Sequence, residues 1–469
     1  DKAVAESRER VRAALLGMGL SLPPKRVLVN LAPADIAKEG SHFDLPIAMA
    51  LLAAVEIMPE DALEGVVALG ELSLDGDIMP VAGALPAALA AAESGRGLLC
   101  PAGSGAEAAW VSNAEVIAPS SLALALRHFS GQQVLPPASP GEVTTPPGAR
   151  CLRDIKGQEK AKRALEIAAA GRHHLFFVGT PGSGKSMLAA RLPTILPPLS
   201  PSEALETSMI HSLAGLLSSG GISRLRPFRA PHHTASMAAI VGGGRGAKPG
   251  EISLSHNGVL FLDELPEFPR AVLETLRQPI ETGEVMVARA NAHVTYPSRF
   301  LLIAAANPCR CGYFSDPSRA CTRAPVCGDD YLGKISGPLM DRFDLRVDVP
   351  PVAYRDLDLP ASGPSSAEVA ARVMQARARQ AARAATSGSG AMLNADLEGA
   401  ALEQFAAPDP EGRDLLSRVA DRFGLSARGY HRILRVARTI ADLEGCDQVA
   451  RHHIAEAAGF RIGALRERA

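Results

Sequence analysis

A glycine-rich octapeptide, Gly179-Thr180-Pro181-Gly182-Ser183-Gly184-Lys185-Ser186, has the residue types and spacing that suit phosphate binding. It fits the pattern G-x-x-x-x-G-K-[ST], in which glycines let backbone N–H groups turn inward around phosphate oxygens. The apolar run 175–178 before it predicts a buried strand, and the run 187–192 after it predicts a helix. Lys185 is therefore expected to reach the β- and γ-phosphates of a nucleotide, and the Ser186 hydroxyl to bind Mg²⁺.

Two further apolar runs end in polar residues that suit the same chemistry. Residues 259–262 are followed by Asp263 and Glu264, and residues 300–306 are followed by Asn307. Ligands of open α/β sheets lie at the carboxyl ends of the strands. Asp263 is expected to hold Mg²⁺, mostly through water, and Glu264 to polarise the water that attacks the γ-phosphate. Asn307 is expected to hydrogen-bond the γ-phosphate or that water; a strand-end loop without chemistry is the alternative for the acidic pair.

Four of the seven cysteines occur in one stretch, at Cys309, Cys311, Cys321 and Cys327. Four thiolates in one loop match the tetrahedral site that Zn²⁺ prefers, and a bound ion would hold an insertion that has little core of its own. The Cys-x-Cys start and the irregular later spacing leave unligated thiols as the alternative. The pattern suits a reducing cytosol better than a disulfide framework, so we expect a cytoplasmic protein.

Length and composition leave the class of partner open. The chain has 469 residues, enough for roughly two to four domains, and its 47% hydrophobic and 21% charged residues are typical of globular proteins. No apolar run approaches the length of about 20 residues that crosses a bilayer, and no secretory signal is recognisable, so no membrane partner is expected. The net charge of -1 neither favours nor excludes DNA, and aromatic residues make up only 4%. Any contact with DNA is therefore expected to depend on charge more than on stacking.

Hydrophobic periodicity and proline content divide the chain into four parts. We expect an α/β unit over 1–129, a proline-rich linker over 130–150, a nucleotide-binding core over 151–355 and a helical domain over 365–469. In the first part, strands are expected over 25–31 and 66–69, and helices over 44–55 and 85–93. In the last part, helices are expected over 367–385, 410–423, 427–443 and 449–460.

Four motifs of the first part carry a resemblance to a known family: Val29-Asn30-Leu31-Ala32-Pro33-Ala34-Asp35, Lys38-Glu39-Gly40, Phe43-Asp44-Leu45-Pro46 and Gly70-Glu71-Leu72-Ser73-Leu74-Asp75-Gly76. They resemble the Lon-protease-like domain of magnesium-chelatase-like ATPases of the ComM/YifB type. Lon proteases cut with a Ser–Lys dyad, and the alignment puts His42 at the serine position and Ala87 at the lysine position. The resemblance therefore implies a domain without a catalytic dyad, which builds a ring or a docking surface.

Later motifs resemble the AAA+ module of the same family. They are Asp154-Ile155-Lys156-Gly157-Gln158, Ser336-Gly337-Pro338-Leu339-Met340-Asp341-Arg342-Phe343-Asp344 and Leu425-Ser426-Ala427-Arg428-Gly429-Tyr430-His431-Arg432. The resemblance implies that Ile155 lies on the adenine side and that Asn307 is the sensor-1 residue. It also implies that Arg342 is an arginine finger for the neighbouring subunit and that Arg428 is the sensor-2 arginine of a helical lid. A structural pair of Arg342 with Asp341 or Asp344 is the alternative. The arginines that follow Arg428 in the lid are expected on a solvated face or a subunit contact, at Arg432, Arg435 and Arg438.

Two segments match pore elements of that family. Residues 226–234 and 242–251 match its signature insert, and the alternating stretch 283–296 predicts a hairpin at the place of its pre-sensor-1 hairpin. The adjacent histidines His232 and His233 lie on a proline-flanked loop and are not expected to bind a metal. The candidates for contact with a DNA backbone, whose alternative is exposed loop charge, are Arg245, Lys248, Arg289 and His293.

The resemblance covers nearly the whole chain and implies an α/β fold. It implies a degenerate Lon-protease-like (S5-like) N-terminal domain, a P-loop AAA+ α/β core and a C-terminal α-helical lid. The implied activity is that of a hexameric ring that hydrolyses ATP with Mg²⁺ and moves along single-stranded or branched DNA. In that family the work is branch migration during natural transformation. Two alternatives are a motor subunit that remodels a chelatase-type protein partner, which the Lon-like domain disfavours, and a non-catalytic scaffold, which Lys185, Asp263 and Glu264 disfavour.

Overall fold

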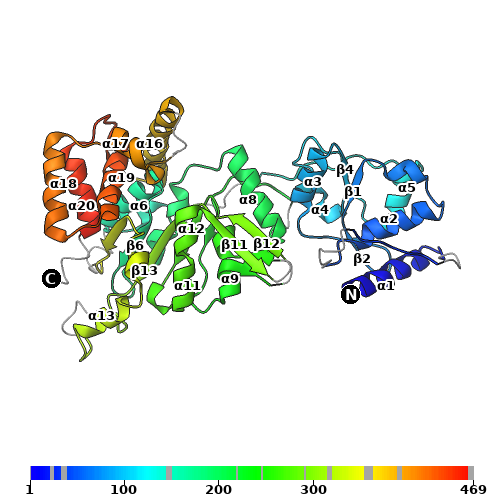
Figure 1. Cartoon of the computed structure of the whole chain (residues 1–469), viewed down its shortest axis with the longest axis horizontal. Helices are drawn as coiled ribbons and strands as arrows, with labels where there is room; N and C mark the ends of the chain where they lie inside the picture. Colours follow the sequence, from blue (N-terminus) through cyan, green and yellow to red (C-terminus); the bar gives the residue numbers. More distant parts are fainter. Residues whose placement is uncertain are drawn as a thin grey trace.

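A computed structural model describes residues 2–21, 26–32, 40–143, 150–217, 220–244, 247–289, 292–313, 320–352, 363–387 and 393–462. Several expected features lie outside these ranges: the Lys38-Glu39 stretch, part of the linker (144–149) and Arg245. Figure 1 shows an elongated chain with an N-terminal α/β unit at one end, an α/β core in the middle and a helical bundle at the other end. Among the described helices, none is long and apolar enough to cross a membrane.

The N-terminal unit contains a small parallel sheet covered by helices. Its strands are ordered β1-β4-β5 (Val66–Ala68, Gly97–Leu99, Val116–Ile117), and a short hairpin joins β2 (Glu71–Leu72) to β3 (Ile78–Met79). The helices are α1 (Lys2–Gly17), α2 (Asp44–Ala54), α3 (Ala84–Glu93), α4 (Ala102–Ala108) and α5 (Leu122–Phe129). The strand expected near 66–69 and the helices expected near 44–55 and 85–93 are confirmed.

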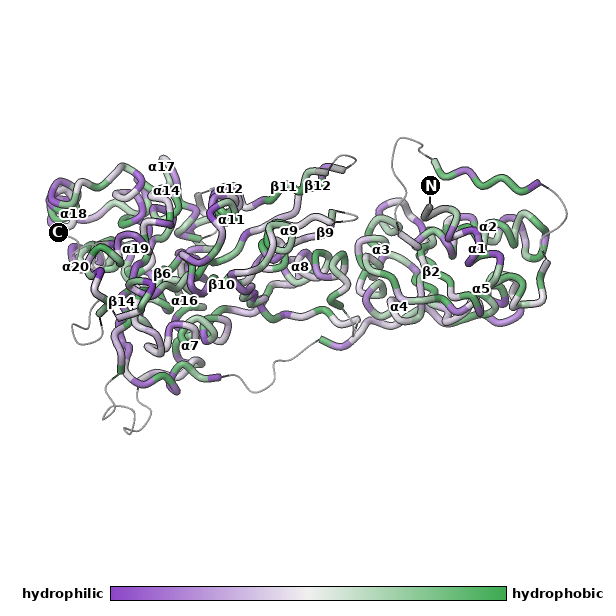
Figure 2. Tube along the Cα trace, turned by 90° about the horizontal axis from the view of Figure 1, so that it is seen from below, coloured by the Kyte–Doolittle hydropathy of each residue, from purple (hydrophilic) through white to green (hydrophobic). Residues whose placement is uncertain are grey.

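One expected strand of this unit is wrong. The described part of 25–31, residues 26–31, has no regular secondary structure, and Val27, Leu28 and Val29 are exposed. In Figure 2 this apolar segment runs apart from the helices of the unit, between two grey traces. A β-branched, apolar sequence favours a strand only when a neighbouring strand pairs with it. Among the described residues, none pairs with this segment.

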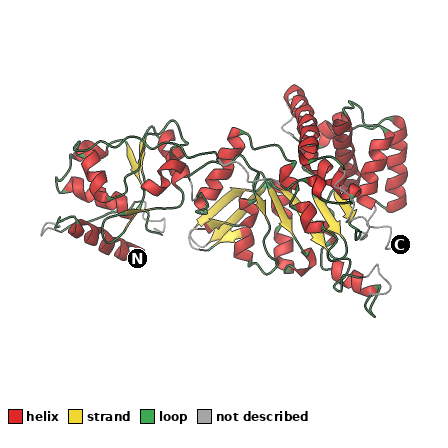
Figure 3. Cartoon of the chain, turned by 180° about the vertical axis from the view of Figure 1, so that it is seen from behind, coloured by secondary structure: helices red, strands yellow, loops and turns green. Residues whose placement is uncertain are grey.

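The core is a five-stranded parallel sheet in the order β14-β6-β13-β10-β7. Figure 3 shows helices on both faces of this sheet, which explains why its strands are continuous apolar runs rather than alternating ones. The register pairs Val178 with Ala306 and Leu262 with Ala304, so three strands end at one edge. The strands are β6 (Leu175–Val178), β7 (Phe228–Arg229), β10 (Val259–Leu262), β13 (Leu301–Ala306) and β14 (Leu345–Asp348).

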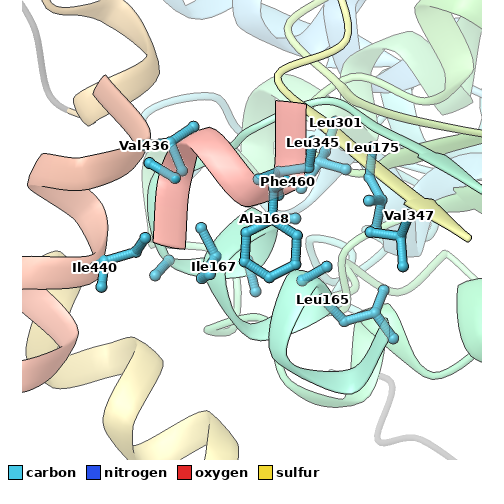
Figure 4. Packing of buried hydrophobic residues seen from close by; sticks show 14 of the residues in the cluster. Leu165, Ile167, Ala168, Leu175, Leu301, Leu345, Val347, Val436, Ile440 and Phe460 are labelled. Atoms are coloured by element: carbon cyan, nitrogen blue, oxygen red, sulfur yellow. The ribbon is translucent and has the colours of Figure 1, made fainter. Parts of the chain in front are cut away.

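Helix α6 (Glu159–Gly171) joins the sheet to the helical bundle. Figure 4 shows Ile167 and Ala168 of this helix between sheet residues such as Val347 and bundle residues such as Val436 and Ile440. These side chains form one continuous apolar cluster, so the bundle and the sheet share a core. The four helices expected in this part are confirmed, and the bundle comprises α16 (Ser366–Ser387), α17 (Gly399–Phe405), α18 (Pro410–Phe423), α19 (Ala427–Glu444) and α20 (Arg451–Ile462).

Helix α8 (Pro201–Leu213) joins the core to the N-terminal unit. Its residues Leu205 and Met209 pack against the apolar cluster that contains α3. The backbone N–H of Gly83 donates to the carbonyl of Ser212 at 3.1 Å, and the indole N–H of Trp110 donates to the carbonyl of Gly220 at 3.1 Å. The two parts therefore share apolar and polar contacts in addition to the linker.

The acidic residues before β14 bind arginines of the bundle. Asp344 accepts a hydrogen bond from Arg432 of α19, and Asp341 pairs with Arg461 of α20 at 3.2 Å. The expected solvated or intersubunit face of α19 is therefore wrong for Arg432. It is also wrong for Arg438, which is buried and donates to Asp442 at 2.9 Å.

Arg435, which lies between Arg432 and Arg438 in α19, also has partners within the chain. Arg435 donates from Nε to the carbonyl oxygen of Leu397 at 2.7 Å and pairs with Glu398 at 3.3 Å. The spacing of three and four residues places these arginines along one helical face, as expected. That face meets partners from other elements, which the sequence of the helix alone does not reveal.

The buried charges at this junction have strongly shifted pKa values. Burial by itself would raise the pKa of Asp344, but Arg432 and His173 hold it well below its ordinary value. Burial lowers the pKa of His174 to about 3, with Asp344 opposing and Arg432 adding to the shift. The His174 Nδ1 atom accepts a hydrogen bond from the Leu302 N–H at 3.0 Å, which requires that nitrogen to be unprotonated. The folded chain therefore keeps His174 neutral.

We expect His174 to make the folded protein less stable in mild acid. An unfolded histidine, with an ordinary pKa of about 6.5, takes up a proton between pH 7 and pH 5 that the folded one excludes. The free energy of unfolding should therefore fall by about 2 kcal/mol over this range from His174 alone. His174→Asn places its Oδ1 atom where Nδ1 accepts from Leu302 but cannot titrate, so urea titrations at the two pH values should show a correspondingly smaller decrease. The exposed His431→Asn variant is the control, and equal pH dependence in all three proteins would contradict the assignment.

Candidate active site

The phosphate loop follows β6 and leads directly into α7 (Lys185–Ala189). Gly182 and Gly184 have φ angles of 76° and 93°, in the left-handed region that side chains disfavour. A Cβ atom on Gly179 would collide with the carbonyl oxygen of Val349. The glycines at these three positions are therefore required by the backbone itself, and the expected strand–loop–helix arrangement is present.

Lys185 connects the phosphate loop to the end of β13. Its ammonium donates to the carbonyl oxygens of Gly179 at 2.7 Å and Thr180 at 2.9 Å, and to Asn307 Oδ1 at 3.1 Å. Burial lowers the pKa of Lys185, while the negative charges of Asp263 and Glu264 act in the opposite direction. Lys185 and Asn307 are thus brought together although 122 positions separate them.

The residues expected to hold magnesium are also adjacent. Ser186 donates its hydroxyl proton to Asp263 Oδ2 at 2.6 Å, and the other carboxylate oxygen of Asp263 accepts the Glu264 N–H at 3.0 Å. Mg²⁺ binds hydroxyl and carboxylate oxygens and keeps several water ligands. The donor set therefore fits the ion: both atoms are hard oxygens on facing sides of one edge of the sheet.

Glu264 has a neighbour that the sequence did not single out as functional. Its backbone has a φ of 51°, unusual for a residue with a side chain, and its Oε2 atom lies 3.4 Å from His233 Nδ1. The His233 ring lies against those of His232 and Phe268. The sequence contained one clue to this contact, because the histidine pair follows β7 closely. Since β7 runs parallel to β10, residues just after these two strands lie at the same edge of the sheet.

The three remaining nucleotide-site candidates lie in different environments. Arg342 is buried, donates to the carbonyl oxygen of Pro338 and forms an ion pair with Glu281. Its partner is therefore neither Asp341 nor Asp344, and reaching a neighbouring subunit would require the pair with Glu281 to open. Arg428 is exposed in the first turn of α19, and Ile155 is buried in the core shared with α6.

The expected hairpin is confirmed, and a second, shorter one lies beside it. Strands β11 (Glu284–Arg289) and β12 (Ala292–Pro297) pair antiparallel, as do β8 (Gly242–Gly243) and β9 (Lys248–Pro249). The Tyr296 hydroxyl donates to the carbonyl oxygen of Ala247 at 2.9 Å, which joins the two hairpins. In Figures 1 and 2 the longer hairpin extends from the core toward the N-terminal unit.

Two of the four DNA-contact candidates are exposed on these hairpins, Lys248 on β9 and His293 on β12. The structure describes Arg289 only by its backbone, at the end of β11, and Arg245 lies outside the described residues. The hairpins therefore present two polar side chains on one side of the core. Whether they meet DNA stays a prediction.

The cysteines beyond Asn307 form a cluster. The sulfur atoms of Cys309 and Cys311 are 3.1 Å apart, and these two and that of Cys327 all lie within 4.8 Å of one another. The Cys321 thiol interacts with those of Cys311 and Cys327. Tetrahedral zinc with Zn–S bonds of about 2.3 Å separates its sulfur ligands by about 3.8 Å. Three of the thiols, those of Cys309, Cys311 and Cys327, are therefore close enough together to bind one metal ion.

A second group of possible ligands in the described part of the chain, Glu444, Cys446 and His453, fits a metal poorly. His453 Nδ1 accepts the Ala450 N–H at 2.8 Å, so in the neutral ring the proton resides on Nε2, which lies 3.1 Å from Glu444 Oε2. A histidine that binds metal through one nitrogen needs a proton on the other. His453 instead caps the start of α20.

Comparison with known proteins places the whole chain in one family. A family model described as magnesium chelatase, subunit ChlI, matches residues 151–357. Models described as subunit ChlI of Mg-chelatase and as the C-terminal part of subunit ChlI match residues 1–104 and 363–461. The described mixed α/β structure with its central parallel sheet agrees with an AAA+-type fold of this family.

Individual relatives narrow the family further. The protein is 44% identical to "Uncharacterized protein YifB" of Salmonella typhimurium, over 98% of this chain and 89% of the relative. It is 43% identical to "Competence protein ComM" of Haemophilus influenzae, over 98% and 90%. It is 25% identical to "Magnesium-chelatase 38 kDa subunit" of Rhodobacter capsulatus, over 70% and 90%. The chain therefore belongs to the magnesium-chelatase-like family of the ComM/YifB type.

Proposed function

We propose that the protein is an ATP-driven, hexameric DNA motor that promotes branch migration of recombination intermediates in natural transformation. One observation carries the ATPase part: at one edge of the sheet, Lys185 of the phosphate loop is hydrogen-bonded to Asn307, and the next residue, Ser186, to Asp263. The family implies an ATPase that uses ATP and Mg²⁺. The name of the Haemophilus relative supports a role in competence, and hence contact with DNA.

Each residue of the site has a separate role in the proposed phosphoryl transfer. Lys185, whose ammonium lies among oxygen atoms, would bind the β- and γ-phosphates once it leaves the loop carbonyls. Ser186 and Asp263 would hold Mg²⁺, which neutralises phosphate charge when bound. Glu264 would orient the attacking water and accept its proton, and His233 positions that carboxylate. Asn307 would hydrogen-bond the γ-phosphate or the water. Its hydrogen bond with Lys185 holds it close to the place of the phosphates.

The lid and the N-terminal unit have supporting roles in this proposal. Arg428, exposed at the first turn of α19, would contact the nucleotide when the lid moves and so couple nucleotide state to lid position. The N-terminal unit is proposed to be a Lon-like domain without a dyad. The His42 ring lies 3.3 Å from the carbonyl oxygen of Ala82, and Ala87 on α3 has no functional group. Such a unit suits ring building or docking rather than proteolysis.

Contact with DNA is proposed for the two hairpins. Lys248 and His293 are exposed there, and Arg245 and Arg289 are neighbours in the sequence. We propose that these side chains bind the phosphates of the DNA backbone, so binding should weaken with salt and show little sequence preference. With a single tryptophan in the chain, at Trp110 in the N-terminal unit, stacking on indole is not expected to contribute.

A second candidate function is a motor subunit that remodels a chelatase-type protein partner. It is favoured by the description of the family models and by the relationship to the Rhodobacter chelatase subunit. It shares the nucleotide chemistry of the first proposal and differs in what the hairpins contact. Stimulation of the ATPase by DNA therefore separates the two.

The proposal predicts an ATPase that branched DNA stimulates and that needs Glu264. Glu264→Gln removes the proton acceptor and should lower the turnover number by about 100-fold or more, while ATP affinity is retained. The measurements are phosphate release with and without branched DNA and binding of a fluorescent ATP analogue. The exposed Glu60→Gln, far from the site on the N-terminal unit, is the control. An active ATPase that DNA leaves unchanged would favour the chelatase-type function.

Arg342 is proposed to act on the neighbouring subunit's nucleotide after its pair with Glu281 opens. Arg342→Ala should then lower turnover by about 1,000-fold with ATP affinity nearly unchanged. Glu281→Gln is the matched variant, because it removes the same ion pair but keeps the arginine, and it should retain turnover. If both variants lose turnover equally, or if Arg342→Ala no longer binds ATP, the arginine supports the fold of its own subunit instead.

We also propose a structural zinc ion at Cys309, Cys311, Cys321 and Cys327. Two observations support it: the sulfur atoms of Cys309, Cys311 and Cys327 lie within 4.8 Å of one another, and the Cys321 thiol interacts with those of Cys311 and Cys327. The residues 322–326 between the last two cysteines are exposed, so this insertion has little apolar core to hold it. Elemental analysis of purified protein should find one zinc ion per chain. A fully folded protein that contains no zinc would contradict the assignment.

A further inference from the structure

The cysteine cluster lies immediately beside the nucleotide site. Cys309 follows Asn307 by two residues in the loop that leaves β13, and Asn307 accepts a hydrogen bond from Lys185. A tight turn follows, in which the Gly312 N–H donates to the carbonyl oxygen of Cys309 at 3.0 Å and Gly312 has a φ of 85°. The position of Cys309 therefore restricts where Asn307 can lie.

The same turn covers the phosphate loop. A Cβ atom on Gly312 would lie 2.5 Å from Cγ of Pro181, so the two loops are already in contact. Pro181 occupies the third position of the octapeptide that binds phosphates. A displacement of the Cys309–Gly312 turn would therefore change the packing of the phosphate loop as well as the position of Asn307.

The other end of the cluster belongs to a helix that lies near the segment following Glu264. Cys327 belongs to α13 (Val326–Leu332), which also carries the buried residue Tyr331. Burial, together with the nearby carboxylates of Glu267 and Glu264, raises the pKa of Tyr331. Lys334, just beyond the helix, lies 3.9 Å from Glu267. The four thiols therefore join the turn beside Asn307 to a helix whose Tyr331 is near the carboxylates of Glu267 and Glu264.

We propose that a thiophilic divalent metal ion bound by Cys309, Cys311, Cys321 and Cys327 controls the nucleotide site, by fixing the turn that positions Asn307 and covers Pro181. This inference rests on the ATPase proposed above. The bound ion would hold the turn to α13 through the cysteine thiolates. Without it that link is lost, and the position of Asn307 is less firmly fixed. Metal loading then regulates ATP affinity and turnover.

The first test removes one ligand. We compare the full-length wild type, Cys327→Ser and, as matched control, Cys446→Ser, a cysteine of the lid outside the cluster. Zinc content is measured by elemental analysis, ATP affinity by titration with a fluorescent ATP analogue, and folding by thermal unfolding. Cys327→Ser should lose zinc and bind the analogue at least about tenfold more weakly, which corresponds to about 1.4 kcal/mol. Cys446→Ser should match the wild type in both.

A second variant tests the coupling with all four thiols present. Gly312→Ala inserts a methyl group against Pro181 and should keep zinc while it weakens binding of the analogue. Gly337→Ala, where a Cβ atom meets open space, is its control. This variant keeps the proposal testable if Cys327→Ser does not fold.

The outcomes separate the two proposals. Loss of zinc from Cys327→Ser with unchanged ATP affinity, or an unchanged affinity in Gly312→Ala, overturns the coupling. A folded wild type without zinc overturns the metal site itself. A zinc-loaded wild type that binds no ATP overturns the proposed function and leaves the metal site in place.

Discussion

The contact between the Lys185 ammonium and the Asn307 side chain depends on the order of the strands in the core sheet. Parallel strands bring their carboxyl ends to one edge, and the sheet places β6 next to β13 and one strand away from β10. Residues from three distant parts of the chain therefore meet without any long loop between them. The half-buried ammonium is tolerated because carbonyl and amide oxygens surround it. Every other feature of the site is placed relative to this edge.

The acidic residues just before β14 determine how the helical bundle is held. Asp341 and Asp344 are separated by less than one helical turn, yet they bind arginines from two different helices of the bundle, Arg461 and Arg432. Removing either partner would leave a buried or half-buried charge unpaired, which costs far more than a surface ion pair contributes. The shared apolar core around α6 adds a non-directional attraction. The helical bundle is thus attached to the core both by charge and by packing.

Sequence patterns predicted the features that depend on residues close together in the chain. The phosphate loop, the strand ends that carry Asp263 and Asn307, the hairpin and the lid helices follow from glycine placement and from hydrophobic periodicity. The strand expected over 25–31 was wrong because strand formation needs a partner elsewhere. The environments of Arg342, Arg432 and Arg438 were not predictable either, because their partners are set by packing: Arg461 and Asp341, for example, are 120 positions apart. The proximity of His233 to Glu264 is missed for the same reason.

The packing of α8 against α3 has a mechanical consequence for the whole molecule. Helix α8 begins twelve positions after the end of α7, and its Leu205 and Met209 pack in the apolar cluster of the N-terminal unit. A displacement of the segment after the phosphate loop would therefore act on the N-terminal unit through packed side chains as well as through the linker. The orientation of that unit is thereby coupled to the geometry of the core.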